Sequence, residues 1–102
     1  MILESAILDV NPSRTKEFEG ALAKAQPIIS AANGYLSHEL QRCLENPHRY
    51  LLLVRWRSLE DYTEGFRKSG PYRQWKRLLH HFYEPFPTVE HYEPVVSAGR
   101  RT

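Results

Sequence analysis

The stretch RYLLLVRWRSLED, residues 49–61, decides the fold. Its first part, Arg49 to Arg57, is rich in Leu, Val, Tyr and Trp, which is typical of a β-strand. Strand alternation places one set of side chains on the same side: Tyr50, Leu52, Val54 and Trp56. Ser58 with Asp61 three residues later resembles a capping box, which predicts that a helix begins there. A strong strand that passes directly into a helix is therefore the centre of the predicted fold.

The residues before this stretch predict a strand, a helix and a second strand. Ile2 to Val10 is rich in Ile, Leu and Val, as strands are. Asn11-Pro12 is typical of a helix start, and an apolar stripe at helical spacing follows it. Pro27 predicts a kink in the last turns of this helix, and Asn33-Gly34 predicts its end. Tyr35 to Leu44 alternates like a strand, so we expect a hairpin with the central strand.

The residues after it predict a broken helix and a last strand. Ser69-Gly70-Pro71 interrupts the helix, and Pro71 begins a second helical segment. Thr88 to Val95 is predicted as an edge strand, because Pro94 cannot donate to a ladder. We therefore expect one domain over residues 1–96 and a flexible tail over 97–102. The order β-α-β-β-α-β is typical of an α+β, ferredoxin-like four-stranded antiparallel sheet with helices on one face. The bare face then needs a partner, most simply a second copy.

Composition excludes several classes of protein. The chain of 102 residues has 41% hydrophobic and 25% charged residues, a balance typical of globular domains. It contains no apolar run long enough to span a membrane, and no basic-then-apolar leader at its start. The net charge of +2 is too small to predict nucleic-acid binding. The one cysteine, Cys43, excludes a disulfide within the chain and favours the cytoplasm.

Aromatic residues gather in the second half of the chain. Of the 12 Phe, Trp and Tyr residues, ten lie at or after Tyr50. A core needs some of them, but so many in half of a small domain indicate a large apolar cavity or a large interface. Five are candidates for the wall of a pocket for a small aromatic ligand, with core packing as the alternative for each: Trp56, Tyr62, Phe66, Tyr72 and Trp75.

His38 is the best placed candidate for a catalytic base. It stands between Leu36 and Leu40 on one face of its predicted strand, where a half-buried imidazole can accept a proton near neutral pH. A structural histidine that bonds to a neighbouring strand is the alternative. His80 and His81 are adjacent on a helix, so they do not converge on one metal ion. We therefore predict no metal site.

The stretch from Tyr50 to Glu60 resembles the third-strand-to-helix signature of the antibiotic biosynthesis monooxygenase family. Phe66 to Tyr72 and the strand Val89 to Tyr92 are similar to later parts of the same family. The resemblance implies a dimeric α/β barrel, in which two copies face each other through their sheets and each holds a substrate pocket between sheet and helices. It also implies oxygenation without metal or flavin, because an electron-rich phenol or quinol supplies the electrons once it has lost a proton.

The resemblance leaves three functions open. The first is a cofactor-independent monooxygenase for a small aromatic or quinol-type compound. The second is a non-catalytic ligand-binding or stress-response protein of the same fold. The third, haem binding or degradation, is disfavoured because that branch uses an Asn, a Trp and a His where this chain places Ala6 or Ile7, Phe66 and Lys76.

Overall fold

The computed structural model describes residues 1–100 and confirms the predicted ferredoxin-like fold. The elements follow the expected order, with short helical turns between the main ones: β1 (Ile2–Asp9), η1 (Pro12–Arg14), α1 (Thr15–Ser30), β2 (Tyr35–Arg42), β3 (Arg49–Trp56), η2 (Asp61–Phe66), α2 (Gly70–Leu79), η3 (His80–Phe82) and β4 (Val89–Tyr92). Among the described residues, no helix combines the length and the apolar character needed to cross a membrane.

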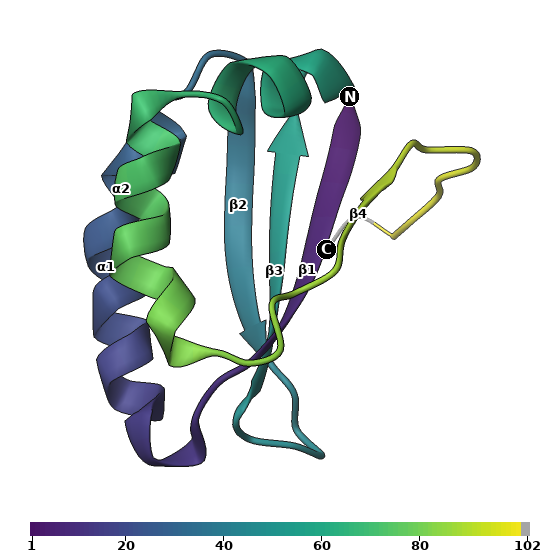
Figure 1. Cartoon of the computed structure of the whole chain (residues 1–102). Helices are drawn as coiled ribbons and strands as arrows, with labels where there is room; N and C mark the ends of the chain where they lie inside the picture. The colour runs from purple at the N-terminus through teal and green to yellow at the C-terminus, as the bar shows by residue number, and fades with distance from the viewer. Residues whose placement is uncertain (101–102) are drawn as a thin grey trace.

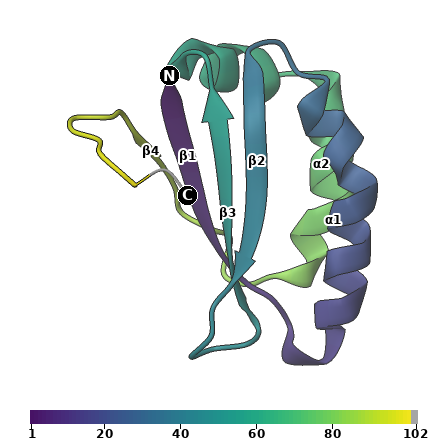
Figure 2. The ribbon, with the colours of Figure 1, turned by 180° about the vertical axis from the view of Figure 1, so that it is seen from behind.

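The four strands form one antiparallel sheet in the order β2-β3-β1-β4. Both long helices lie on the same side of this sheet, as the two opposite views show (Figures 1 and 2). Strands β1 and β3 pair over their whole length, from Ile2 opposite Trp56 to Asp9 opposite Arg49. The two central strands therefore place their even-numbered residues toward the helices and their odd-numbered residues on the open face.

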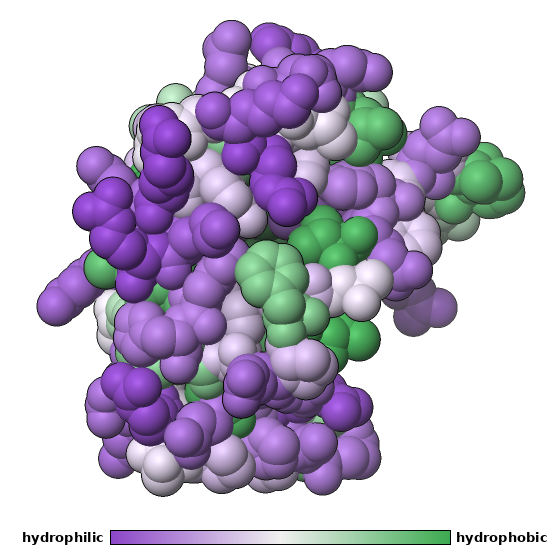
Figure 3. All heavy atoms as spheres, in the orientation of Figure 1, coloured by the Kyte–Doolittle hydropathy of each residue, from purple (hydrophilic) through white to green (hydrophobic). Residues whose placement is uncertain are grey.

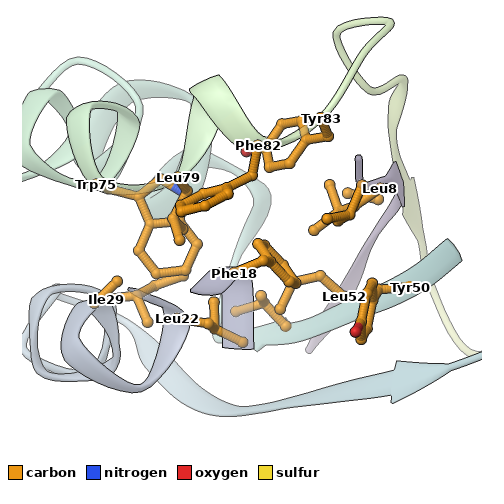
Figure 4. Close-up of a cluster of buried hydrophobic side chains, with 14 of the residues drawn as sticks. Leu8, Phe18, Leu22, Ile29, Tyr50, Leu52, Trp75, Leu79, Phe82 and Tyr83 are labelled. Carbon is orange, nitrogen blue, oxygen red and sulfur yellow. The ribbon is translucent and has the colours of Figure 1, made fainter. Parts of the chain in front are cut away.

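The core fills the space between the sheet and the helices (Figure 4). Leu8, Tyr50 and Leu52 come from the sheet, and they face side chains of α1 and of the α2–η3 segment. Phe18 of α1 is completely buried, and its ring centroid lies 4.9 Å from that of Tyr50. Burying one side chain of this size contributes roughly 1.5–3 kcal/mol to the free energy of unfolding. This packing holds the second half of the chain against β1 and β3.

Local chemistry explains the helix ends. The Asn11 side chain accepts a hydrogen bond from the Ser13 amide, but a 3₁₀ turn precedes α1, which begins at Thr15. The helix continues through Pro27 to Ser30. Gly34 has a φ of +81°, and a Cβ at this position would collide with the Asp61 side chain. The predicted stop at Asn33-Gly34 is thus confirmed, because the turn requires a glycine there.

Two elements differ from their predicted form. Strand β4 is shorter than expected and covers Val89–Tyr92. The segment after Ser58 contains a π-helix, η2, whose wider turns carry Tyr62 and Phe66 inward. The predicted tail over 97–102 lies partly outside the described residues, so its flexibility remains a prediction.

The open face of the sheet carries apolar side chains in contact with solvent. Ile7 of β1 is 53% exposed and Tyr92 of β4 is 50% exposed, while Leu51 and Leu53 of β3 are half-buried. These side chains border a shallow groove of about 600 Å³. Figure 3 shows a mostly hydrophilic surface on which apolar atoms emerge near the segment that leads into β4 and again after it. A face of this kind is typical of an interaction surface.

Candidate functional site

A small cavity lies between the sheet and the helices, and we call it the aromatic cavity. Its volume is about 40 Å³. It is lined by residues of β1, β3, α1, η2, α2, η3 and β4 and of the segments that follow η2 and η3: Glu4, Ala6, Leu8, Ile29, Leu52, Tyr62, Phe66, Arg67, Tyr72, Trp75, His80, Tyr83, Phe86, Pro87 and Val89. A space of this size holds a water molecule or two, and a ligand-sized pocket is roughly ten times larger.

The five aromatic candidates gather at this cavity. Tyr62, Phe66, Tyr72 and Trp75 line it. Trp56 is completely buried behind them, with ring centroids 5.8 Å from Tyr62 and 5.7 Å from Phe66. Tyr72 and Trp75 both meet Phe66 edge to face. The sequence therefore predicted a group that does come together, while substrate binding by its members remains a prediction.

Glu4 is the charged residue that the sequence interpretation missed. Its side chain is 6% exposed, and it is the one buried charged residue in the described part of the chain. It lines the aromatic cavity from β1. The Trp56 indole Nε1 donates a hydrogen bond of 2.8 Å to Glu4 Oε1. The strand alternation carried a signal, because Glu4 shares its face with Ala6, Leu8 and Val10, which are all buried.

Burial sets the proton affinity of this carboxyl. Removing the carboxylate from water raises the pKa of Glu4 to about 7, although the hydrogen bond from Trp56 and the positive charge of Arg67 both act to lower it. Arg67 lines the same cavity, and its guanidinium carbon lies 5.5 Å from the centroid of the Tyr72 ring. The carboxyl can therefore accept or release a proton near neutral pH, close to the positive charge of Arg67.

Two more polar groups adjoin Glu4. His91 of β4 pairs with Glu4 across the sheet, and its ring contacts that of Tyr62 in a tilted arrangement, with centroids 4.8 Å apart. Burial lowers the pKa of His91, and its buried Nε2 has no hydrogen-bond partner among residues 1–100. Burial, with a smaller contribution from the charge of Glu4, raises the pKa of the Tyr62 hydroxyl to about 12. At neutral pH both groups are uncharged.

His80 separates the aromatic cavity from a wide cleft at the end of α2. The cleft has a volume of about 580 Å³, and His48 and His81 line it together with His80. Burial, with the nearby charges of Lys76 and Arg67, lowers the pKa of His80 to about 4. Despite the three imidazoles, no group of three ligating side chains within the described chain lies close enough to hold a metal ion.

His38 lies elsewhere, on the edge strand β2. A β-bulge between Tyr35 and Ser37 brings Tyr35 onto the side of His38, whereas Leu36 is 50% exposed. The Tyr35 hydroxyl lies 2.5 Å from His38 Nδ1, and Gln26 Oε1 lies 2.9 Å from His38 Nε2. Burial lowers the pKa of His38. His38 does not line the aromatic cavity, so its role as a base remains a prediction that the cavity does not support.

Comparisons with known proteins identify the family. Residues 1–78 match the family model described as antibiotic biosynthesis monooxygenase. The chain is 54% identical over 95 residues to YczJ of Bacillus subtilis, an uncharacterised protein, covering 93% of this chain and all of that one. A solved structure from Bordetella bronchiseptica, named for the same monooxygenases, has a TM-score of 0.89 and 33% identity, with 93% of this chain and 97% of that chain covered.

A further solved structure, Rv0793 from Mycobacterium tuberculosis, shares the fold alone. Its TM-score is 0.78 at 17% identity, and the alignment covers 96% of this chain and 98% of that chain. The match to the family model covers more than half of the chain, and the fold agrees with it. The chain therefore belongs to the antibiotic biosynthesis monooxygenase family.

Proposed function

We propose that this protein is a cofactor-independent monooxygenase that oxidises a small phenolic or quinol-type compound in the aromatic cavity. The observation that carries the proposal is a buried carboxyl, Glu4, in a cavity walled by aromatic side chains. Aromatic walls bind a flat ring, and a group that titrates near neutral pH can remove its acidic proton. Membership of the monooxygenase family supports the same chemistry.

The reaction needs no external reductant when the substrate is electron-rich. Anthrone is a suitable probe, because loss of one methylene proton gives an anion that O₂ can oxidise. The methylene carbon becomes a carbonyl with one oxygen atom of O₂, and the second oxygen atom leaves as water with the two hydrogen atoms of the methylene. All four electrons come from the substrate. The protein then positions the ring, excludes water and handles the proton.

A ligand needs more room than the cavity offers in its present form, and Phe66 is the side chain that can provide it. Phe66 lines the aromatic cavity on one side and an outer pocket of about 290 Å³ on the other. Ile28, Ala32 and Pro71 also border this outer pocket. A rotation of the Phe66 ring would join the two spaces into one close to the lower limit of small-molecule sites, roughly 300 Å³.

Oxygen uptake tests the proposal. Anthrone and its 1,8-dihydroxy derivative are incubated with the protein under air, and O₂ consumption and the quinone product are measured. The wild-type protein is expected to exceed the rate without protein, and Phe66→Leu is expected to change the KM for the probes. Phe82→Leu is the matched control, because Phe82 is also buried but does not line the cavity. No uptake above the background rate with either probe would reject the proposal.

A non-catalytic ligand-binding protein is the second candidate, because the cavity has a volume of only about 40 Å³. In that case a probe raises the melting temperature but is recovered unchanged. Thermal unfolding with each probe under argon, followed by mass analysis of the probe after exposure to air, separates binding from turnover.

We further propose that a second copy of the chain covers the open face of the sheet. Apolar side chains occupy the middle of this face, among them Ile7, Leu51 and Leu53, while Asp9 and Arg55 supply both signs of charge on it. A two-fold pair of such faces buries its own apolar groups and can match opposite charges. This arrangement closes the sheet side of the molecule and leaves the aromatic cavity within each copy.

A further inference from the structure

The geometry around Glu4 assigns a specific task to this carboxyl. Glu4 lies on β1, a central strand that pairs with β3 on one side and β4 on the other, so its backbone is fixed on both sides. The Trp56 indole bonds one carboxyl oxygen, Oε1, at 2.8 Å. No described side chain bonds the other oxygen, Oε2. One oxygen therefore holds the group in place, and the other can take a proton from a molecule in the cavity.

Of the described ionisable side chains around Glu4, only Arg67 carries a full charge at neutral pH. From β4 comes His91, and from η2 comes Tyr62; both are neutral at this pH. From α2 comes Tyr72, whose pKa is raised by burial, so it is also neutral. Arg67, which follows η2, is the cation. Tyr83 also lines the cavity and is neutral, because burial raises its pKa. An anion formed in the cavity therefore meets the positive charge of Arg67 and the neutral hydroxyl groups of tyrosines.

We propose that Glu4 is the catalytic base that takes the acidic proton of the substrate, and that Arg67 stabilises the anion that remains. The proton is the O–H proton of a phenol or the methylene proton of its keto tautomer. That bond breaks, a new O–H bond forms at Glu4 Oε2, and the electron pair stays on the substrate, with its charge on the substrate oxygen. This inference rests on the proposed function for the identity of the substrate class.

Position favours Glu4 over the histidines for this step. His38 has both ring nitrogens within hydrogen-bond distance of protein side chains and does not reach the cavity. His80 lines the cavity, but its pKa of about 4 makes it a much weaker base than Glu4. A base whose pKa lies near the working pH is the more effective proton acceptor.

Deuterium exchange without oxygen isolates the proton-transfer step from oxygenation. Anthrone is incubated in D₂O under argon, and incorporation of deuterium at its methylene carbon is followed by NMR at several pH values. The variants are Glu4→Gln, which keeps an acceptor for Trp56, Arg67→Gln, and Glu64→Gln as the control. Glu64 is an exposed carboxylate that pairs with Lys68 and does not line the cavity. Oxygen uptake is measured separately on the same proteins.

The wild-type protein is expected to accelerate exchange, with a rate that rises with pH through about 7 and then levels off. Glu4→Gln is expected to lose roughly 100-fold or more, the usual contribution of a positioned base. Arg67→Gln is expected to lose at least about tenfold, because the anion is no longer stabilised. Glu64→Gln is expected to match the wild type.

The outcomes separate this inference from the proposed function. Exchange that depends on Glu4 without any oxygen uptake supports the base and rejects the monooxygenase. Oxygen uptake and exchange that both persist in Glu4→Gln reject the base and leave the monooxygenase standing. Wild-type exchange no faster than the solution rate also overturns the assignment of Glu4.

Discussion

The carboxyl of Glu4 on β1 and the indole of Trp56, the last residue of β3, are joined by a hydrogen bond of 2.8 Å. Both side chains are buried, Trp56 completely. This bond holds an ionisable group of the cavity lining in an apolar site, and no described side chain bonds its second oxygen. Burial destabilises the charged form of the Glu4 carboxyl and so raises its pKa. The same burial therefore lowers the stability of the fold at high pH and makes Glu4 a base suited to neutral pH.

Glu4→Gln should stabilise the fold at high pH. The pKa of Glu4 is raised from 4.5 to about 7 on folding, so its contribution to stability is fully present below pH 4.5 and is lost as the pH rises to about 7. Glutamine mimics the neutral carboxyl at every pH. The variant should therefore gain about 2–3 kcal/mol over the wild type between about pH 5 and pH 8. Urea unfolding of both proteins at the two pH values measures this difference.

The comparison with the variant is needed because His80 acts in the opposite direction. Its pKa is depressed to about 4, so its contribution is present above 6.5 and is lost as the pH falls to about 4. The two effects partly cancel in the wild-type curve and separate only in the difference. If the stability of Glu4→Gln relative to the wild type were the same at pH 8 as at pH 5, or lower, the raised pKa of Glu4 would be wrong.

Trp56→Phe should make Glu4 a weaker acid. The indole hydrogen bond lowers the pKa of Glu4, so removing it should move that pKa above about 7. The free energy of unfolding should also fall by about 1–3 kcal/mol, because a buried polar atom loses its partner. The infrared band of the protonated carboxyl, identified by its absence in Glu4→Gln, reports the pKa. Trp75→Phe is the control, since Trp75 lines the cavity without bonding Glu4. An unchanged or lower pKa would contradict this account of the pair.

His38→Gln tests the histidine that the sequence favoured as the base. The two ring nitrogens of His38 lie within hydrogen-bond distance of Tyr35 and Gln26, and His38 does not line the aromatic cavity. Oxygen uptake by His38→Gln should therefore stay within about twofold of the wild-type rate. Uptake with anthrone by His38→Gln and Glu4→Gln, measured side by side, decides between the two bases. A loss of about 100-fold in His38→Gln alone would return the role of base to His38.

The fold followed from local patterns, and the site did so only in part. The alternation in residues 49–57 predicted which side chains of β3 share a face, but not which of the two faces the helices cover, and Gly34 marked the end of α1. The bulge beside Leu36 could not be read from strict alternation, and it places Tyr35 next to His38. Glu4 was overlooked because a charge is expected to face water, and its burial depends on Trp56, which is 52 residues away in the sequence.

Leu53→Glu should convert a dimer into a monomer. Leu53 lies on the open face in the middle of β3, where it pairs with Ser5 on β1 and Glu39 on β2. A carboxylate there would be buried without a partner in a two-fold interface, whereas in a monomer it would stay in water. Size-exclusion chromatography with light scattering should give twice the chain mass of 12.0 kDa for the wild type and the single mass for the variant. Leu44→Glu is the control, because Leu44 is 88% exposed in the β2–β3 turn and does not border the groove. A wild-type protein that elutes as a monomer at micromolar concentration would reject the proposal that a second copy covers the open face. The proposals for the aromatic cavity and Glu4 would still stand, because both lie on the helix side of the sheet.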